Sequence, residues 1–170
     1  AYYECPSLCG LLLNGVVDSI RRQELEIGKD FEFIVVSIDP EEDAKLASWK
    51  KETYLKDYGR PGADKGWHFL TGTEENIQQL TQDLGFGYRY VEETGEYAHS
   101  AGFFVLTPEA KISRVHFGVQ FEPRDVRLSL LEAADGKIGS FADKVLLFCF
   151  RYDPSSKGYA LHAFRLVQAG

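Results

Sequence analysis

The sequence is short of cysteines, of basic residues and of long apolar runs, and each shortage excludes a class of protein. Three cysteines in 170 residues are too few for a small domain held together by disulfides. Nineteen basic against twenty-six acidic residues give a formal net charge of −7, which argues against a nucleic-acid partner because such proteins need a basic surface. The longest strongly apolar run, residues 145–150, is far below the ~18 residues of a membrane-spanning helix.

The chain begins abruptly, with four residues before Cys5. No signal peptide is visible in the sequence, and an export signal or a membrane anchor could have been trimmed from its N-terminus. A length of 170 residues is most simply one domain that buries its own core.

Apolar spacing predicts helices and strands in alternation along most of the chain. Asp39 is expected to cap the second helix, with Pro40 in its first turn and Glu42 completing a capping box. The expected helices cover about residues 6–24, 39–59, 73–85 and 122–134, and the expected strands cover 31–39, 66–72, two segments around a turn at 107–110, and a terminal hairpin of 144–153 and 158–168.

This order matches an α/β thioredoxin-like fold, in which a central mixed sheet is flanked by helices. Residues 1–134 would form this domain, with strand 31–38 in the centre of its sheet, and residues 135–170 would form a C-terminal extension that contains the β-hairpin. The fold also needs a strand before the first helix, and residues 1–4 are shorter than a typical strand of ~5–6 residues. We therefore expect that an upstream strand is missing from this sequence.

Cys5 and Cys9 stand four residues apart at the start of the first expected helix. Residues at this spacing share one helix face, and their Cα atoms lie within the range that a disulfide tolerates. A helix N-terminus also favours thiolate over thiol. The pair can therefore be a structural disulfide, a redox couple or two ligands of a soft metal, and the spacing alone leaves redox and metal roles open.

The cysteine pair is the first of several segments that occur in a specific order. They are YYECPSLC, LLLNGVVDSI, FIVVSIDPEED, FLTGTEENIQQLTQDLGF and YAHSAGFFVLTPEAKISR, within about residues 1–134. Together they resemble the Sco/SenC family, thioredoxin-like proteins needed to assemble the binuclear copper site of cytochrome c oxidase. The C-x-x-x-C motif combined with the SIDP and YAHS segments makes this resemblance specific.

The resemblance implies that Cys5, Cys9 and His99 bind copper. Thiolates suit the soft Cu(I) ion and imidazole suits both copper oxidation states, so these ligands would give a trigonal Cu(I) site, whereas Cu(II) would need a fourth donor. Under this interpretation residues 90–100 form a loop that brings His99 to the helix N-terminus and moves as metal is loaded and released.

Other candidate residues have simpler interpretations. The family places an aspartate like Asp39 near the copper site, but the helix cap explains this residue fully. His68 and His116 are expected on a polar or edge face of their strands, and Cys149 is expected to be a small buried apolar residue. For His162 the family pattern gives no guidance.

The resemblance implies a metallochaperone rather than an enzyme. It would deliver copper to cytochrome c oxidase subunit II or another copper-site protein, or reduce the cysteines of that target, after loading from an upstream copper donor. We expect it in the bacterial periplasm, on the outer face of the inner membrane, held by an anchor outside this sequence. The rival prediction is a thiol–disulfide oxidoreductase that needs only Cys5 and Cys9, and a peroxidase-like relative is a weaker rival because Tyr2 occupies the position where a threonine is expected.

Overall fold

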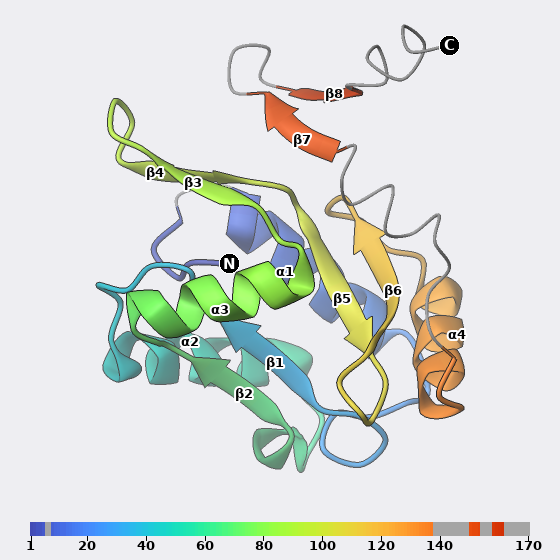
Figure 1. The fold of residues 1–170 in the computed structure, drawn as a ribbon. Coiled ribbons are helices and arrows are strands. Elements are labelled where there is room, and N and C mark those ends of the chain that lie inside the picture. Colours follow the sequence, from blue (N-terminus) through green and yellow to red (C-terminus); the bar gives the residue numbers. More distant parts are fainter. Residues whose placement is uncertain (6–7, 138–149, 154–157, 162–170) are drawn as a thin grey trace, which may run out of the picture.

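The computed structural model describes residues 1–5, 8–137, 150–153 and 158–161 (Figure 1). The helices of this part are α1 (Leu8–Arg21), α2 (Ala44–Tyr58), α3 (Glu74–Leu84) and α4 (Pro123–Ala134), with a 3₁₀ turn η1 (Ala63–Lys65). Its strands are β1 (Phe33–Val36), β2 (Trp67–Leu70), β3 (Tyr88–Val91), β4 (Glu96–His99), β5 (Gly102–Leu106), β6 (Ile112–Phe117), β7 (Phe150–Asp153) and β8 (Gly158–Leu161). The mixed α/β class is as predicted.

The strands of the described residues pair two by two. Strand β1 runs parallel to β2, whereas β3–β4, β5–β6 and β7–β8 are antiparallel pairs. On the other edge of β1, the Ala1 amine donates to the Val36 carbonyl and the Ile38 amide donates to the Ala1 carbonyl. Within the described residues β1 therefore has one partner strand, and the expected position of strand 31–38 at the centre of a larger sheet is not found.

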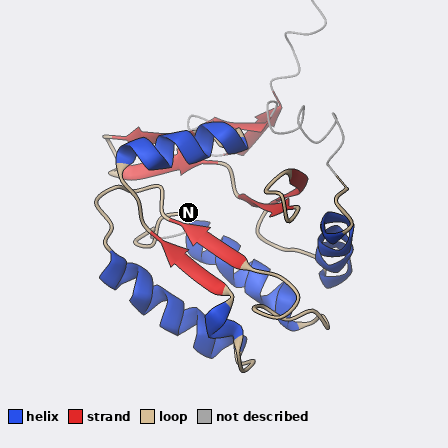
Figure 2. Cartoon of the chain, turned by 60° about the horizontal axis from the view of Figure 1, so that its bottom comes forward, coloured by secondary structure: helices blue, strands red, loops and turns tan. Residues whose placement is uncertain are grey.

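The β1–β2 pair lies between two layers (Figure 2). Helices α1 and α2 pack on one side, and α3 with the β3–β4 ribbon lies on the other. Alternate strand residues point into the core on the α1–α2 side, and the central members of that core are Val16, Val17, Ile20, Val35, Tyr54, Tyr58, Trp67 and Phe69. Since burial removes apolar surface from water, this cluster is the main stabilising unit of the fold.

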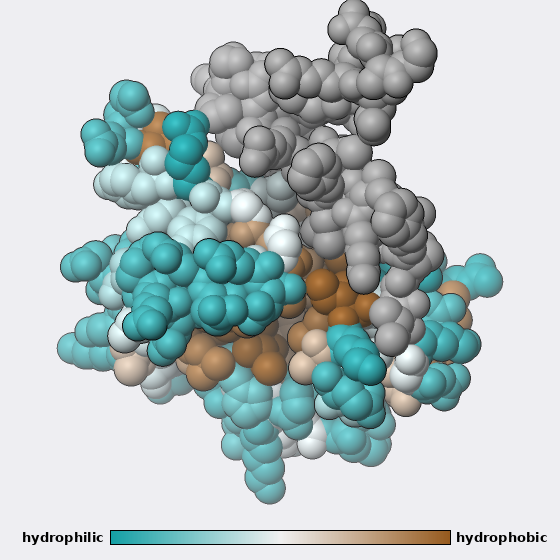
Figure 3. All heavy atoms as spheres, viewed as in Figure 1, coloured by the Kyte–Doolittle hydropathy of each residue, from teal (hydrophilic) through white to brown (hydrophobic). Residues whose placement is uncertain are grey.

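The opposite face of the β1–β2 pair is apolar but open. Ile34 is 57% exposed and Leu70 is 45% exposed, and apolar surface is visible in the hollow below α3 (Figure 3). The continuous apolar run of this segment predicted a strand buried on both faces. In the structure only the face towards α1 and α2 is buried.

The start of α2 differs from the sequence prediction. The N-cap is Asp43, whose carboxylate accepts from the Leu46 amide at 2.8 Å. Asp39 instead accepts from the Glu41 amide two residues on, a local turn that competes with helix capping. The predicted roles of Asp39 as the cap and of Glu42 in a capping box are therefore wrong. For α3, by contrast, the Thr73 cap and the stop at Gly85 are confirmed.

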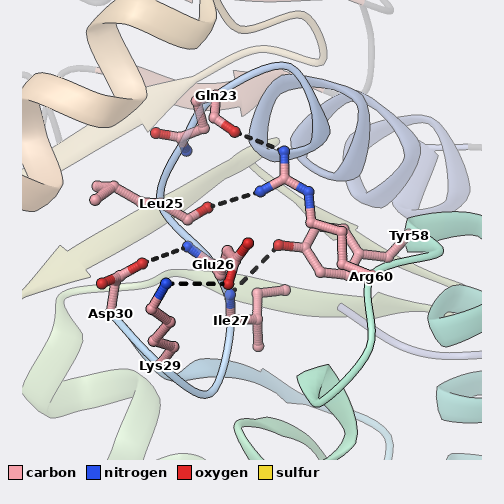
Figure 4. Close-up of polar contacts among 8 residues, drawn as sticks. All are labelled: Gln23, Leu25, Glu26, Ile27, Lys29, Asp30, Tyr58 and Arg60. Carbon is pink, nitrogen blue, oxygen red and sulfur yellow. Dashed lines mark hydrogen bonds and ion pairs between the residues drawn. The ribbon is translucent and has the colours of Figure 1, made fainter.

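Arg60 fixes the end of α1 and the loop that follows it (Figure 4). Its guanidinium donates to the carbonyls of Arg21 and Gln23 at 2.7 and 2.6 Å, which would otherwise lack a partner at the helix C-terminus. The same loop approaches η1 so closely that a Cβ on Gly66 would lie 2.2 Å from the Gly28 Cα. The C-terminal end of α1 is thereby held against the end of α2.

Residues 90–100 form a hairpin rather than the expected loop. Strands β3 and β4 pair from Tyr88 opposite His99 to Val91 opposite Glu96, and the chain reverses through Gly95 at φ 68°. Alternation along the two strands places Tyr88, Tyr90, Tyr97 and His99 on one face. This ribbon, and not an irregular loop, presents His99.

The two histidines of the predicted strands differ in environment. His68 lies on a partly exposed face, where it pairs with Glu32 at 2.7 Å, as expected. His116 stacks on Phe103 with ring centroids 4.8 Å apart and hydrogen-bonds to the buried Ser129. Burial lowers its pKa below the usual 6.5. His116 is thus partly buried, on a strand that has a single partner strand among the described residues.

The last described segments are β7 and β8. They pair antiparallel with Tyr152 opposite Tyr159, and β7 contacts β4. Cys149 and His162 lie outside the described residues. In the part of the chain that the structure describes, no helix is long and apolar enough to cross a membrane.

Candidate metal centre

Cys5 and Cys9 meet at the N-terminus of α1. Cys9 is the second residue of the helix and its amide points at the Cys5 sulfur, with N and Sγ 3.4 Å apart. Both cysteines are in the thiol form; Cys9 is 2% exposed and Cys5 is partly exposed. The structure thus places the Cys5 sulfur beside the Cys9 amide at the start of the helix.

His99 reaches the same place from the end of β4. Its Nε2 atom lies 3.3 Å from the Cys9 sulfur, although the two residues are ninety positions apart in the sequence. Its Nδ1 atom lies 3.0 Å from the Ser100 carbonyl oxygen. Because a carbonyl only accepts, Nδ1 carries the proton and the Nε2 lone pair faces the sulfur of Cys9.

Burial controls the charge state of this pair. It raises the pKa of the Cys9 thiol to about 12, and it lowers the pKa of His99. The sequence predicted a thiolate favoured by the helix N-terminus, but desolvation of the buried sulfur outweighs the helix dipole here. Cys9 is therefore a protonated thiol next to a neutral imidazole, and binding of a metal would release the thiol proton.

Aromatic rings enclose the imidazole, and the sequence analysis did not single them out. The Tyr2 and Phe86 rings lie 6.4 and 5.8 Å from the His99 ring, and Tyr2 also contacts Tyr97 at 5.3 Å. Burial, together with the nearby Cys5 thiol, raises the pKa of the Tyr2 hydroxyl. The available signal was the position of Tyr2, three residues before Cys5, which sequence reasoning used only to exclude peroxidases.

Asp39 lies just outside this cluster. Burial, together with the nearby Asp39 carboxylate, raises the pKa of the Tyr97 hydroxyl to about 12. Asp39 is thus close to Tyr97, whose ring contacts Tyr2. Among the described residues, no three His, Cys, Asp or Glu side chains are grouped closely enough to hold a metal ion as they stand.

These residues support two kinds of chemistry. Two neighbouring thiols can be oxidised to a disulfide, and a thiol paired with an unprotonated imidazole nitrogen can become two ligands of a soft metal. The hydrogen bond from Nδ1 to a backbone carbonyl is the arrangement typical of metal-binding histidines.

Comparison with known proteins places the chain in a family. Residues 1–130 match the family model SCO1/SenC. A putative electron transfer protein of Aquifex aeolicus VF5 is 25% identical over 81% of this chain and 76% of its own, with a TM-score of 0.66. A SCO1/SenC family lipoprotein of Bacillus anthracis str. Ames shares 16% identity over 78% of this chain and 77% of its own, with a TM-score of 0.59.

A further solved structure is ScoI of Arabidopsis thaliana with copper bound. It shares 19% identity over 79% of this chain and 80% of its own, with a TM-score of 0.55. No curated protein matches the chain. The fold is therefore that of a thioredoxin-like protein, here with Cys9 in its first helix and Cys5 just before that helix. The chain belongs to the SCO1/SenC family.

Proposed function

We propose that this protein binds copper through Cys5, Cys9 and His99 and passes it to another protein. The observation that supports this most is the contact between the Cys9 sulfur and the His99 Nε2 atom at 3.3 Å, with the nitrogen lone pair directed at the sulfur. Thiolates and imidazole are the ligands that suit copper. The copper-bound ScoI of Arabidopsis is a structural neighbour with the same fold.

The spacing of the two atoms fits a shared metal ion. Thiolate and imidazole bonds to zinc are about 2.3 and 2.0–2.1 Å long, so two such ligands at tetrahedral or trigonal angles lie roughly 3.5–3.8 Å apart. The observed 3.3 Å needs only a slight widening. Two thiolates and one neutral imidazole favour Cu(I), and Cu(II) would take a fourth donor from the protein or water.

Cys5 is the third proposed ligand. Its sulfur lies 3.4 Å from the Cys9 amide nitrogen, which places it beside the Cys9 end of the proposed site. Because Cys5 is more exposed than Cys9, it is the ligand that an incoming or outgoing copper ion meets first.

The proposed recipient is cytochrome c oxidase subunit II or another copper-site protein, and an upstream copper donor would load the site. The protein would act as a metallochaperone, with reduction of target cysteines by the Cys5–Cys9 pair as a second task. A periplasmic location at the outer face of a bacterial inner membrane suits this role. The lipoprotein of Bacillus anthracis among the structural neighbours supports export and a membrane anchor.

A thiol–disulfide oxidoreductase without a copper role is the alternative. The close approach of Cys5 to Cys9 favours it, and the Aquifex neighbour is described as a putative electron transfer protein. This function would not require an imidazole nitrogen beside Cys9. His99 therefore separates the two proposals.

Replacement of His99 by alanine should weaken copper binding while the Cys5–Cys9 disulfide still forms. Loss of an outer-shell partner of a metal ligand lowers metal affinity by about 10–100-fold. Because His99 is a proposed ligand itself, we expect the copper affinity of the reduced protein to fall by at least this much. Titration of the reduced protein against a chromogenic Cu(I) chelator measures the affinity, and thiol quantification after oxidation measures the disulfide.

The matched control is His68→Ala. His68 is partly exposed and pairs with Glu32 away from the cysteines, so this variant should bind copper like the parent protein. If His99→Ala retains the parental affinity, His99 is not a ligand and the oxidoreductase function is favoured.

A further inference from the structure

Glu42 is a buried carboxylate, 8% exposed, that the helix cap does not use. It lies in the turn between β1 and α2, just before the Asp43 cap. Its Oε2 atom accepts from the Tyr3 amide at 2.8 Å and its Oε1 atom accepts from the Glu4 amide at 2.7 Å. Its Oε2 also accepts from the Ser37 hydroxyl. A carboxylate that is buried in this way must be satisfied by such donors.

The two amides that Glu42 binds belong to the backbone that leads into Cys5. Each carboxylate oxygen holds one of two consecutive N–H groups, so the pair of bonds fixes both the position and the direction of the chain at Tyr3 and Glu4. The next residue is Cys5, and the preceding one, Tyr2, contacts the ring of His99. Glu42 therefore fixes the backbone of Tyr3 and Glu4, which connects Tyr2 to Cys5.

Other hydrogen bonds hold neighbouring parts of this N-terminal segment. Ala1 bonds to the end of β1, and the Tyr3 hydroxyl donates to the carbonyls of Leu70 and Val35. These contacts hold a side chain and the first residue. The bond from the Glu4 amide to Glu42 holds the backbone immediately before the thiol.

Charge makes these bonds strong and their loss costly. Hydrogen bonds to an ionised carboxylate are roughly twice as strong as those between neutral groups. A glutamine at position 42 has one oxygen and one NH₂ group, so in the same orientation one of the two amides would face a donor and lose its partner.

We propose that Glu42 is a positioning residue for the Cys5–Cys9 site, which it sets by clamping the backbone before Cys5. The expected change in copper affinity rests on the proposed copper site. The expected change in the Cys5–Cys9 disulfide equilibrium does not, because it depends only on the positions of the two thiols. Loosening of the clamp should move Cys5 relative to Cys9 and so change both copper affinity and the Cys5–Cys9 disulfide equilibrium.

The test compares the parent protein with Glu42→Gln and with Glu41→Gln. Glu41 is the exposed neighbour in the same turn, so its variant changes charge equally without touching the clamp. Amide hydrogen exchange at Tyr3 and Glu4 reports the clamp itself. The disulfide equilibrium with glutathione and the Cu(I) affinity report the site, at a temperature where urea unfolding shows all three proteins to be folded.

In Glu42→Gln we expect exchange at Tyr3 and Glu4 to accelerate about tenfold or more, as one charge-assisted bond is lost. Copper affinity should fall about tenfold, the low end for partners outside the ligand shell, and the disulfide equilibrium should shift. Glu41→Gln should match the parent in all three. If Glu42→Gln does not fold, Glu42→Asp keeps the charge but shortens the reach by one methylene and gives the same comparison.

Two results would overturn the proposal. One is parental exchange at Tyr3 and Glu4 in the Glu42 variant. The other is faster exchange or lower stability with an unchanged disulfide equilibrium and unchanged copper affinity, which would make Glu42 a purely structural residue. If the parent protein binds no copper, the proposed function fails, while the exchange and disulfide measurements still decide the role of Glu42.

Discussion

Serine in place of Cys9 is expected to abolish tight copper binding by the reduced protein. Cys9 is the residue that contacts both other members of the site, since its amide reaches the Cys5 sulfur and its own sulfur lies 3.3 Å from His99 Nε2. A hydroxyl is a poor ligand for Cu(I), which prefers soft thiolates. Loss of an outer-shell partner costs about 10–100-fold in metal affinity, so loss of a thiolate should cost about 100-fold or more.

Competition with a Cu(I) chelator measures this effect on the reduced, metal-free protein. Cys149→Ser is the matched control, because it removes the third thiol but not one of the proposed ligands, and its copper affinity should equal that of the parent. Circular dichroism shows whether both variants are folded. Parental affinity in a folded Cys9→Ser protein would contradict the proposed ligand set.

Alanine in place of Trp67 is expected to produce the largest loss of stability. The side chain is fully buried and its ring lies 5.2–6.2 Å from the rings of four neighbours, Phe33, Tyr54, Tyr58 and Phe69. Truncation of a buried tryptophan removes apolar contacts and leaves a cavity, at a cost of about 3–5 kcal/mol. The free energy of unfolding, from urea titration followed by circular dichroism, should fall by this amount.

Trp49→Ala provides the matched comparison. Trp49 is 59% exposed on α2, and surface substitutions of this kind change stability by about 0.5 kcal/mol or less. Equal losses in the two variants would mean that the aromatic cluster around Trp67 is not the stabilising core.

Local signals in the sequence were enough to predict the helix at α3 and the β5–β6 pair. Thr73 and Gly85 are a cap and a stop that act within a few residues. The cap of α2 could not be chosen in the same way, because the DPEED segment offers two aspartates with equal local chemistry. When Asp43 caps the helix, Glu42 is buried against Tyr3 and Glu4. These partners lie almost forty residues earlier in the chain, so local sequence could not reveal this arrangement.

The candidate site needed the fold as well as the sequence. Spacing alone placed Cys5 near Cys9, since residues four apart at a helix start share one face. His99 was assigned through the family resemblance, because no pattern in the sequence links residues ninety positions apart. The hairpin that presents His99 was missed, although Tyr88 and Tyr90 alternate along one face, since Gly and Glu around position 95 favoured a loop.

Copper X-ray absorption on the reduced protein, loaded with one equivalent of Cu(I), tests the central proposal most directly. The account predicts two sulfur ligands and one imidazole nitrogen around copper, from Cys5, Cys9 and His99, with the imidazole signal lost in His99→Ala. A copper ion bound without two sulfurs, or with the same imidazole signal in His99→Ala, would contradict the proposal that these three residues form the metal centre.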